Sequence, residues 1–166
     1  MANIVIPENI EKLKTSQYLR FMDITPNATN PTWKLMGVGV SKDDMATAYN
    51  PQIETEQWVI EDTARNDHTG NQKQTSVPQR CYKNDPVFEF VNDGRDKLNY
   101  ITHILEIDTW DGEGGSYPSK YSDALISITS YSGEQIEYDV YYNGDATEGN
   151  STIVGGTPTF TPNVSL

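Results

Sequence analysis

The side chains best suited to acid–base or nucleophilic chemistry are two histidines, His68 and His103, and one cysteine, Cys81. Cys81 and His103 could be paired as nucleophile and base. However, no helix N-terminus lies directly behind Cys81 to lower its pKa. A histidine on an apolar strand face, such as His103, is more often a bonded core residue than a base. His68 lies in a polar segment and is most simply solvated. We therefore expect an inert thiol and rank a small hydrolase third among the functional hypotheses.

Carboxylates are the next candidates for chemistry. Glu54 and Glu56 would share one strand face, but a glycosidase pair is usually held across a cleft by different strands. The run Asp108–Glu113 resembles a calcium loop superficially, yet it lacks the alternating acidic spacing and the distant bidentate glutamate. We expect Glu54 and Glu56 to form a charged surface and Asp108–Glu113 to form an acidic turn. The sequence thus predicts no enzyme, no metal and no cofactor.

Aromatic side chains offer one binding function. Trp58, Trp110, Tyr117 and Tyr121 could form a platform on which sugars stack, so a carbohydrate-binding β-sandwich module is the main alternative function. The simpler interpretation is that these aromatics fill a small core or an interface.

Composition limits the classes of protein to consider. The chain has 166 residues, 36% of them hydrophobic, which predicts one domain with a modest core, an N-terminal arm (1–32) and a C-terminal tail (149–166) that could be flexible. The 24 acidic and 12 basic side chains give a net charge of −12, which disfavours direct binding to nucleic acid or to anionic membranes. A single cysteine excludes an internal disulfide. The N-terminus lacks a secretion signal and no apolar run approaches membrane-spanning length, so we expect synthesis in the cytoplasm.

One stretch, from Tyr49 to Leu98, organises the predicted fold. It contains a strand with mixed faces over Ile53–Asp62, a polar loop over Thr63–Gln72 that is longer than common hairpin loops, and a second strand leading to Tyr82. Asp85 then caps a helix with Pro86 at its first position. Mixed strand faces indicate a strand that contacts another subunit on one side and water on the other.

The remaining segments alternate strands and turns. We expect a helix stripe of Val87, Val91 and Leu98, and a fold that is mainly β with one main helix. The predicted strands are a short one at Tyr18–Ile24, then Trp33–Val40, Tyr100–Trp110, Tyr121–Tyr131, Glu134–Tyr142 and an edge strand at Thr157–Thr161; the predicted turns are a glycine-rich loop at Thr109–Ser119 and Asn143-Gly144.

Four short motifs in this order resemble the major tail (tail tube) proteins of long-tailed, siphovirus-type phages of Gram-positive bacteria. They are Tyr49-Asn50-Pro51 before the strand, Trp58-Val59-Ile60-Glu61-Asp62 before a polar loop, Tyr82-Lys83 before the helix start Asp85-Pro86-Val87-Phe88, and the ending Pro158-Thr-Phe-Thr-Pro162. The resemblance covers roughly residues 33 to 110. The sequence departs from it at Asn84, where a glycine is expected, and in a less basic segment after the helix.

The resemblance implies an antiparallel β-sandwich flanked by one helix, with a long hairpin loop. It also implies a structural virion protein whose hexameric rings stack into a tube, with tape measure and tail terminator proteins as partners and double-stranded DNA passing through without specific binding. On this interpretation Glu54, Glu56, Glu61 and Asp62 supply negative potential near the lumen or the ring interface. The loop containing Arg65, Asn66, Asp67 and His68 would then stack one ring on the next.

Overall fold

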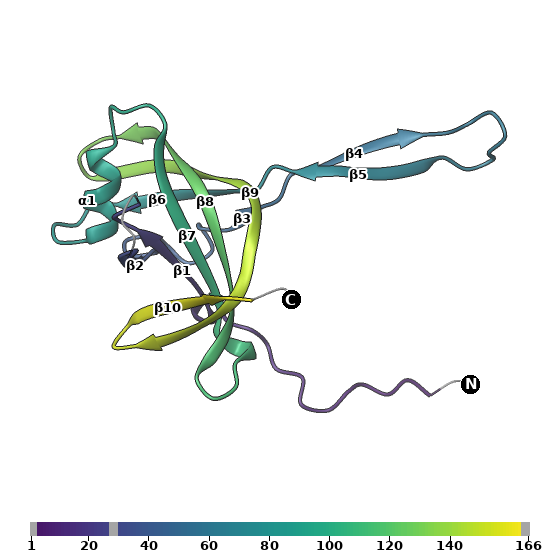
Figure 1. Cartoon of the computed structure of the whole chain (residues 1–166), viewed down its shortest axis with the longest axis horizontal. Coiled ribbons are helices and arrows are strands. Elements are labelled where there is room, and N and C mark those ends of the chain that lie inside the picture. Colours follow the sequence, from purple (N-terminus) through teal and green to yellow (C-terminus); the bar gives the residue numbers. More distant parts are fainter. Residues whose placement is uncertain (1–2, 27–29, 164–166) are drawn as a thin grey trace.

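The computed structural model describes residues 3–26 and 30–163, and its main feature is one large antiparallel sheet (Figure 1). The order of its strands is β2-β1-β7-β8-β9-β6-β3, and β10 pairs with the end of β9. A separate two-stranded sheet, β4-β5, projects from this body (Figure 1). The strands are β1 (Tyr18–Asp23), β2 (Trp33–Leu35), β3 (Thr47–Ala48), β4 (Pro51–Glu56), β5 (Arg65–Asn71), β6 (Gln74–Arg80), β7 (Tyr100–Asp108), β8 (Ser116–Tyr131), β9 (Gln135–Val154) and β10 (Thr157–Pro162).

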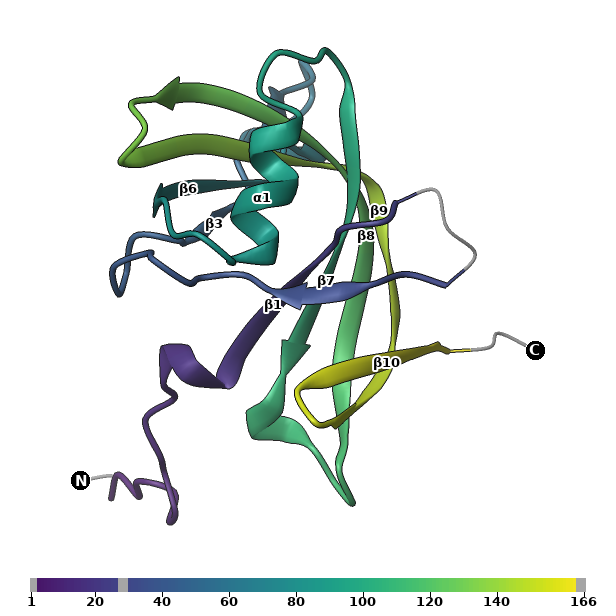
Figure 2. The same ribbon diagram turned by 90° about the vertical axis from the view of Figure 1, so that its left-hand side faces the viewer.

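The predicted mainly β architecture with one flanking helix is confirmed. Its opposing layers belong to one hydrogen-bonded sheet that curves around a core. Met22 of β1 and Val77 of β6 share that core, although β7, β8 and β9 separate their strands in the sheet. The 3-10 turns η1 (Thr15–Gln17) and η2 (Thr109–Asp111) flank β1 and β7. Figure 2 shows the helix α1 (Pro86–Asp93) lying over the curved sheet.

Strand β7 is the centre of the molecule because it is buried on both faces. Ile104 belongs to the first core, which lies under the helix. Leu105 and Ile107 belong to a second core on the opposite face, and all three side chains are fully buried. Successive side chains of a strand point to opposite faces, so one strand supplies both cores.

Aromatic residues build the second core. The end of the sheet returns over β1 and β2, so that Tyr121 of β8 stacks on Phe160 of β10 with ring centroids 5.8 Å apart. Trp33 of β2 meets Tyr121 edge-on, also at 5.8 Å. Such pairs add stabilisation beyond the area they bury. The C-terminal strand is therefore held by packing as well as by its ladder with β9.

Local chemistry fixes the start of the helix as predicted. The Asp85 carboxylate accepts a hydrogen bond from the Val87 amide at 3.2 Å, and Pro86 occupies the first helical position. Asn84 has a φ of 72°, a left-handed backbone that asparagine and glycine both tolerate, so its replacement of the expected glycine is conservative here. Val87 and Val91 are buried, but the helix ends at Asp93 and Leu98 is 92% exposed. The prediction that Leu98 extends the helix stripe is wrong, because the helix is only eight residues long.

The boundaries predicted for the hairpin are also wrong. The first strand ends at Glu56, and the apolar residues Trp58, Val59 and Ile60 lie in the hairpin tip. The predicted polar loop Thr63–Gln72 is mostly a strand, because Arg65–Asn71 pairs with Pro51–Glu56. Apolar and β-branched residues were expected to mark the strand, whereas here they occupy the turn.

Other boundaries also differ from the prediction. The strand expected over Trp33–Val40 ends at Leu35, and the chain turns through Gly39 (φ 77°), whose carbonyl accepts from the Arg80 amide at 2.9 Å. A Cβ on Gly39 would lie 2.8 Å from the Arg80 carbonyl oxygen, so this close approach requires glycine. The loop expected to reach Ser119 ends earlier, since β8 begins at Ser116.

The turn expected at Asn143-Gly144 does not exist, because β9 continues through it. Gly144 has a φ of 71°, and the β8–β9 register shifts between Tyr121 and Asp123. The residues form an irregularity inside a 20-residue strand that β8 keeps paired on both sides. The signal for a turn here marks a bulge.

The expected terminal segments contain regular structure. Within the 1–32 arm, residues 18–23 form β1, and the described residues Asn3–Lys14 precede the first turn η1. Within the 149–166 tail, residues up to Val154 belong to β9 and Thr157–Pro162 form β10. Residues 1–2, 27–29 and 164–166 lie outside the described part of the chain. In that described part, no helix has the length and apolar character needed to cross a membrane.

Candidate functional site

The β4–β5 hairpin is the candidate functional site, and it projects away from the body of the molecule (Figure 1). Every residue of β4 is exposed, and so is every residue of β5 except the half-buried Gly70. A two-stranded hairpin that packs against nothing is marginally stable in water. The hairpin therefore offers two free faces and a tip to a partner.

Strand pairing divides the hairpin residues between its two faces. Glu54 lies opposite Asp67 and Glu56 lies opposite Arg65, so one face carries three carboxylates and one guanidinium. Ile53 pairs with His68 and Thr55 with Asn66 on the other face, where the Thr55 hydroxyl donates to the Asn66 amide oxygen at 2.7 Å. We call Glu54, Glu56 and Asp67 the acidic face. Carboxylates directly opposite one another repel, so this face tolerates a cost that an isolated hairpin would avoid.

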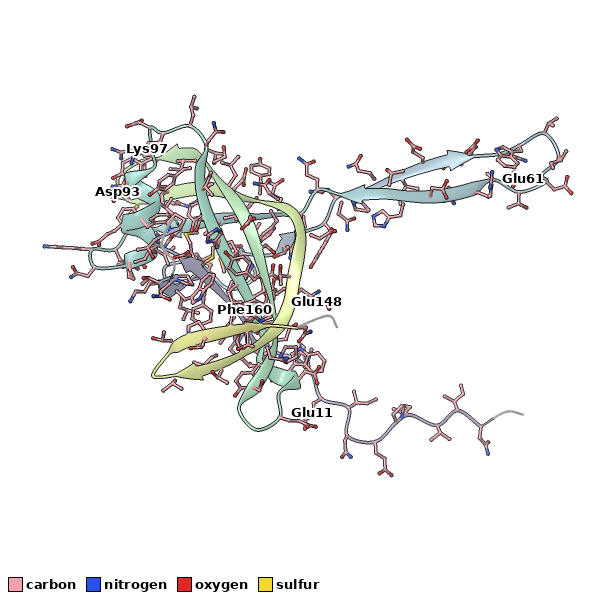
Figure 3. All side chains as sticks on the ribbon, in the orientation of Figure 1. Glu11, Glu61, Asp93, Lys97, Glu148 and Phe160 are labelled. Atoms are coloured by element: carbon pink, nitrogen blue, oxygen red, sulfur yellow. The ribbon has the colours of Figure 1, made fainter. Side chains whose placement is uncertain are left out.

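Of the four acids predicted for the lumen or ring interface, the structure brings Glu54 and Glu56 together. Glu61 and Asp62 lie instead near the far end of the hairpin, where Figure 3 shows Glu61. Of the predicted stacking loop, Arg65, Asn66, Asp67 and His68 all lie in β5. His68 forms a hydrogen bond between its Nε2 and the Asn71 side-chain oxygen at 2.7 Å. Asp67 joins the acidic face, a placement that the sequence reasoning missed because it depends on the register.

The hairpin tip is a small organised cluster around Trp58. The Arg65 guanidinium lies 4.3 Å from the centre of the Trp58 ring and forms an ion pair with Glu61 at 3.2 Å. The indole N–H donates to Glu56 Oε1 at 2.8 Å, and the Trp58 amide donates to Glu61 Oε1 at 3.2 Å. These contacts hold the tip in one shape while leaving Trp58 54%, Val59 101% and Ile60 84% exposed. The tip is thus a preformed apolar surface.

A polar network at the base of the hairpin fixes it to the sheet. The Lys73 ammonium contacts Glu106 Oε1 at 2.5 Å, and the Tyr18 hydroxyl donates to Glu106 Oε2 at 2.5 Å. Lys73 also lies 4.5 Å from the ring centre of Tyr142 and 5.4 Å from that of Tyr49. Burial, with a smaller contribution from Glu106, raises the pKa of Tyr142 to about 12. Burial is also the main reason that the pKa of Tyr18 is raised.

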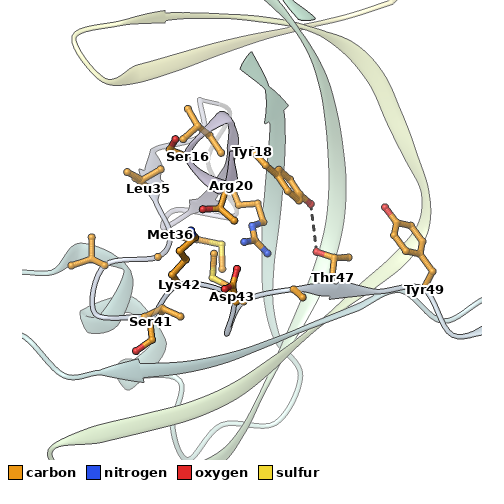
Figure 4. Close-up of a pocket in the computed structure, with 17 residues that line it drawn as sticks. Ser16, Tyr18, Arg20, Leu35, Met36, Ser41, Lys42, Asp43, Thr47 and Tyr49 are labelled. Atoms are coloured by element: carbon orange, nitrogen blue, oxygen red, sulfur yellow. Dashed lines mark hydrogen bonds between the residues drawn. The ribbon is translucent and has the colours of Figure 1, made fainter. Parts of the chain in front are cut away.

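Hydroxyl groups extend this network across the curved sheet. Thr75 Oγ1 lies 3.0 Å from the Tyr142 hydroxyl and 2.9 Å from Thr47 Oγ1. Thr47 in turn lies 3.4 Å from the Tyr18 hydroxyl (Figure 4). Sequence reasoning did not find this network, because its members come from strands far apart in the chain and no local pattern marks them.

The remaining motif residues have structural positions. Tyr49 and Pro51 lie at the base of the hairpin, where the Asn50 side chain donates to the Gln72 carbonyl at 3.0 Å. Tyr82 packs beside Gly39, and Phe88 of the helix packs on the first core. These placements explain the motifs by folding rather than by chemistry.

The groups considered for catalysis are distributed over different cores. Cys81 packs against the first core, and burial raises the pKa of its thiol. His103 stacks beside Tyr121 at the second core and has its Nδ1 3.0 Å from the buried Asp23 carboxylate. Among residues 3–26 and 30–163, no three His, Cys, Asp or Glu side chains are grouped so that they could hold a metal ion.

The aromatics considered for sugar stacking do not share one surface. Tyr117 and Tyr121 pack on the second core, whereas Trp110 is 51% exposed in η2 and Trp58 lies in the hairpin tip. Their arrangement favours a packing role for the tyrosines.

No protein-family model matches this chain, and no curated protein sequence matches it.

Proposed function

We propose that this chain is a structural subunit that self-assembles into stacked hexameric rings forming the tail tube of a long-tailed phage. The observation that carries the proposal is the projecting hairpin, which buries no side chain against its own body and ends in exposed Trp58, Val59 and Ile60. A hairpin of this kind is only marginally stable in water until something covers it. Other copies of the chain are the partner that the resemblance in motif order suggests.

The two edges of the large sheet support the same proposal. β2 and β3 lie at the two ends of the large sheet and are only three and two residues long. Edge strands and unpartnered hairpins are surfaces on which strands of neighbouring subunits can add. In a closed ring each subunit presents one surface to the next, so no edge is left free.

Electrostatics support a conduit for DNA. The acidic face of the hairpin and the net charge of −12 would line a passage that repels the phosphate backbone, so that DNA slides through without binding. We propose that Glu54, Glu56 and Asp67 face the lumen and that the apolar tip contacts the neighbouring subunit or ring. Tape measure and tail terminator proteins would be the other partners, in a virion assembled in the cytoplasm of the bacterial host.

Light scattering of the purified protein over a range of concentrations tests the assembly. We expect species with a mass six times the 18.6 kDa of one chain, followed by larger multiples as rings stack. A chain that stays monomeric at every concentration contradicts the proposal. Binding of the protein to a glycan array would instead favour the carbohydrate-binding alternative.

A further inference from the structure

A groove of about 840 Å³ opens between β1 and the segment 36–49, on the body of the molecule (Figure 4). Its walls are largely apolar, and Leu35 and Val38 on them are 45% and 47% exposed. Met36 and Met45 complete the apolar lining, and Arg20 lies within it. We call this cavity the Arg20 groove. Exposed apolar walls around a concave site favour an apolar occupant.

Arg20 is the unusual residue of this groove. Its Nε and Nη1 atoms are buried and have no hydrogen-bond partner among the described residues. The guanidinium rests 4.7 Å from the centre of the Tyr18 ring, and its cross-strand neighbour Glu106 already accepts from Tyr18 and Lys73. A buried donor without an acceptor is costly, and more so when it is charged. Asp43 also lines the groove but forms no ion pair with Arg20 among the described residues, so the guanidinium still lacks an acceptor.

The N-terminal arm, residues Asn3–Lys14, has the complementary features. All of its residues are exposed, and Ile4, Val5 and Ile6 are 92%, 84% and 75% exposed. It carries two carboxylates, Glu8 and Glu11, and Figures 1 and 3 show it running away from the body. An apolar segment in water gains free energy when a partner covers it. The exposed apolar residues and the carboxylates of the arm therefore match the apolar walls and the guanidinium of the Arg20 groove.

We propose that the Arg20 groove binds the N-terminal arm of a second copy of the chain. Isoleucines of the arm cover Leu35 and Val38, and a carboxylate of Glu8 or Glu11 pairs with the Arg20 guanidinium. Thr15 and Ser16, at the base of the arm, themselves line the groove. A chain could therefore fill its own groove only by reversing at Lys14, whereas the arm of a neighbour can enter freely. This inference rests on the proposed self-assembly and names one of its contacts.

Disulfide trapping between separate chains tests the contact. In a Cys81→Ser background, full-length Ile6→Cys is mixed with full-length Val38→Cys of different tag length and exposed to a mild oxidant. We expect a disulfide-linked dimer of one chain of each kind. The matched control replaces Val38→Cys by Ser127→Cys, an exposed position on β8 outside the groove, and we expect little dimer from it.

The outcomes separate the inference from the proposed function. If the mixture gives no more dimer than the control while the unmodified protein still forms rings, the arm contact is wrong and the assembly stands. If neither dimer nor rings form, both proposals are wrong. A chain carrying both Ile6→Cys and Val38→Cys that closes its disulfide only as a monomer shows that the arm binds its own groove, which also overturns the inference.

A charge variant tests the role of Arg20. Glu8→Gln with Glu11→Gln removes both carboxylates of the arm without changing its apolar residues. We expect its self-association to weaken about tenfold or more, because the buried Arg20 guanidinium then loses its charged acceptor. The control, Lys12→Gln with Lys14→Gln, removes two positive charges from the same arm instead of two negative ones. It should leave the affinity unchanged. Equal affinities for the two variants would contradict the pairing.

Discussion

At the scale of single residues, the most consequential group is Glu106, a buried carboxylate only 8% exposed that joins two parts of the molecule. Lys73, which leads from the hairpin into β6, and Tyr18, which opens β1, both contact it. A buried ion pair contributes little net stability, but removing one partner leaves the other charge buried alone. Glu106 therefore stabilises the attachment of the hairpin base to the sheet.

We expect Lys73→Met to lower the free energy of unfolding by about 3–5 kcal/mol, because it leaves the buried Glu106 carboxylate without its cationic partner. The double variant Lys73→Met with Glu106→Gln should recover most of this loss, because no charge is then left unpaired. Urea denaturation followed by circular dichroism measures both. If the double variant is no more stable than the single one, the destabilisation does not come from the stranded carboxylate.

Asp85 gives a prediction about pH. Burial is the main cause that raises the pKa of its carboxyl in the folded state, although the amides of Val87 and Phe88 and the side chain of Gln79 oppose the shift. The unfolded carboxyl releases its proton first, near pH 4, so folding stability falls as the pH rises through the higher folded pKa. Asn at this position caps the helix but does not titrate.

We therefore expect wild-type protein to lose stability relative to Asp85→Asn as the pH rises from about 4 through the raised folded-state pKa of Asp85. The control is Asp93→Asn at the exposed end of the same helix, whose difference from wild type should vary less with pH. Urea denaturation at several pH values measures these differences. A difference between wild type and Asp85→Asn that stays constant with pH would show that Asp85 does not titrate in this range.

At the scale of elements, the hairpin is a unit that contributes little to the fold of the single chain. Its tip cluster is internal, and its acidic face contacts no part of the described body through an ion pair. Among the ion pairs of the described residues, that of Lys73 at its base is the one that joins it to the sheet. Stability of the monomer and capacity to assemble should therefore be separable by mutation.

Replacing Trp58, Val59 and Ile60 by serine should change the free energy of unfolding by no more than about 0.5 kcal/mol per substitution, as is usual for surface positions. The same variant should fail to assemble, because it removes the apolar surface of the tip. Leu98→Ser, another exposed apolar residue but far from the hairpin in sequence, is the control and should retain assembly. A tip variant that assembles normally would show that the tip is not a subunit contact.

Local chemistry made some elements predictable. The Asp85-Pro86 cap identified the helix, and strict alternation through Ile136, Tyr138 and Val140 identified the core of β9. The hairpin boundaries were not predictable, because strand propensity assumes burial and Trp58-Val59-Ile60 lie exposed in a turn. Gly144 gave a turn signal inside a strand because bulges use the same backbone conformation as turns.

The candidate site was predicted in part. Composition and motif order pointed to the hairpin, and Glu54 and Glu56 were expected on one face. The register that adds Asp67 to that face depends on a bulge between Gln52 and Ile53, which no sequence pattern marks. The network of Tyr18, Thr47, Thr75 and Tyr142 joins strands that meet only when the sheet curves.

At the scale of the whole molecule, the body is tightly packed, whereas the hairpin and the N-terminal arm are exposed to solvent. β7 is buried on both faces, two cores hold the curved sheet, and the helix closes one of them. The hairpin and the N-terminal arm project from this body in Figure 1, with their apolar residues in solvent. A folded body with two uncovered appendages is the form expected of a subunit that is completed by its neighbours.

Negative-stain electron microscopy of the concentrated full-length protein tests this claim most directly. We predict rings with sixfold symmetry and a central lumen, some of them stacked into tubes, and the serine variant of the tip imaged beside them should show none. A field of isolated, compact monomers of the wild-type protein at high concentration would contradict the account.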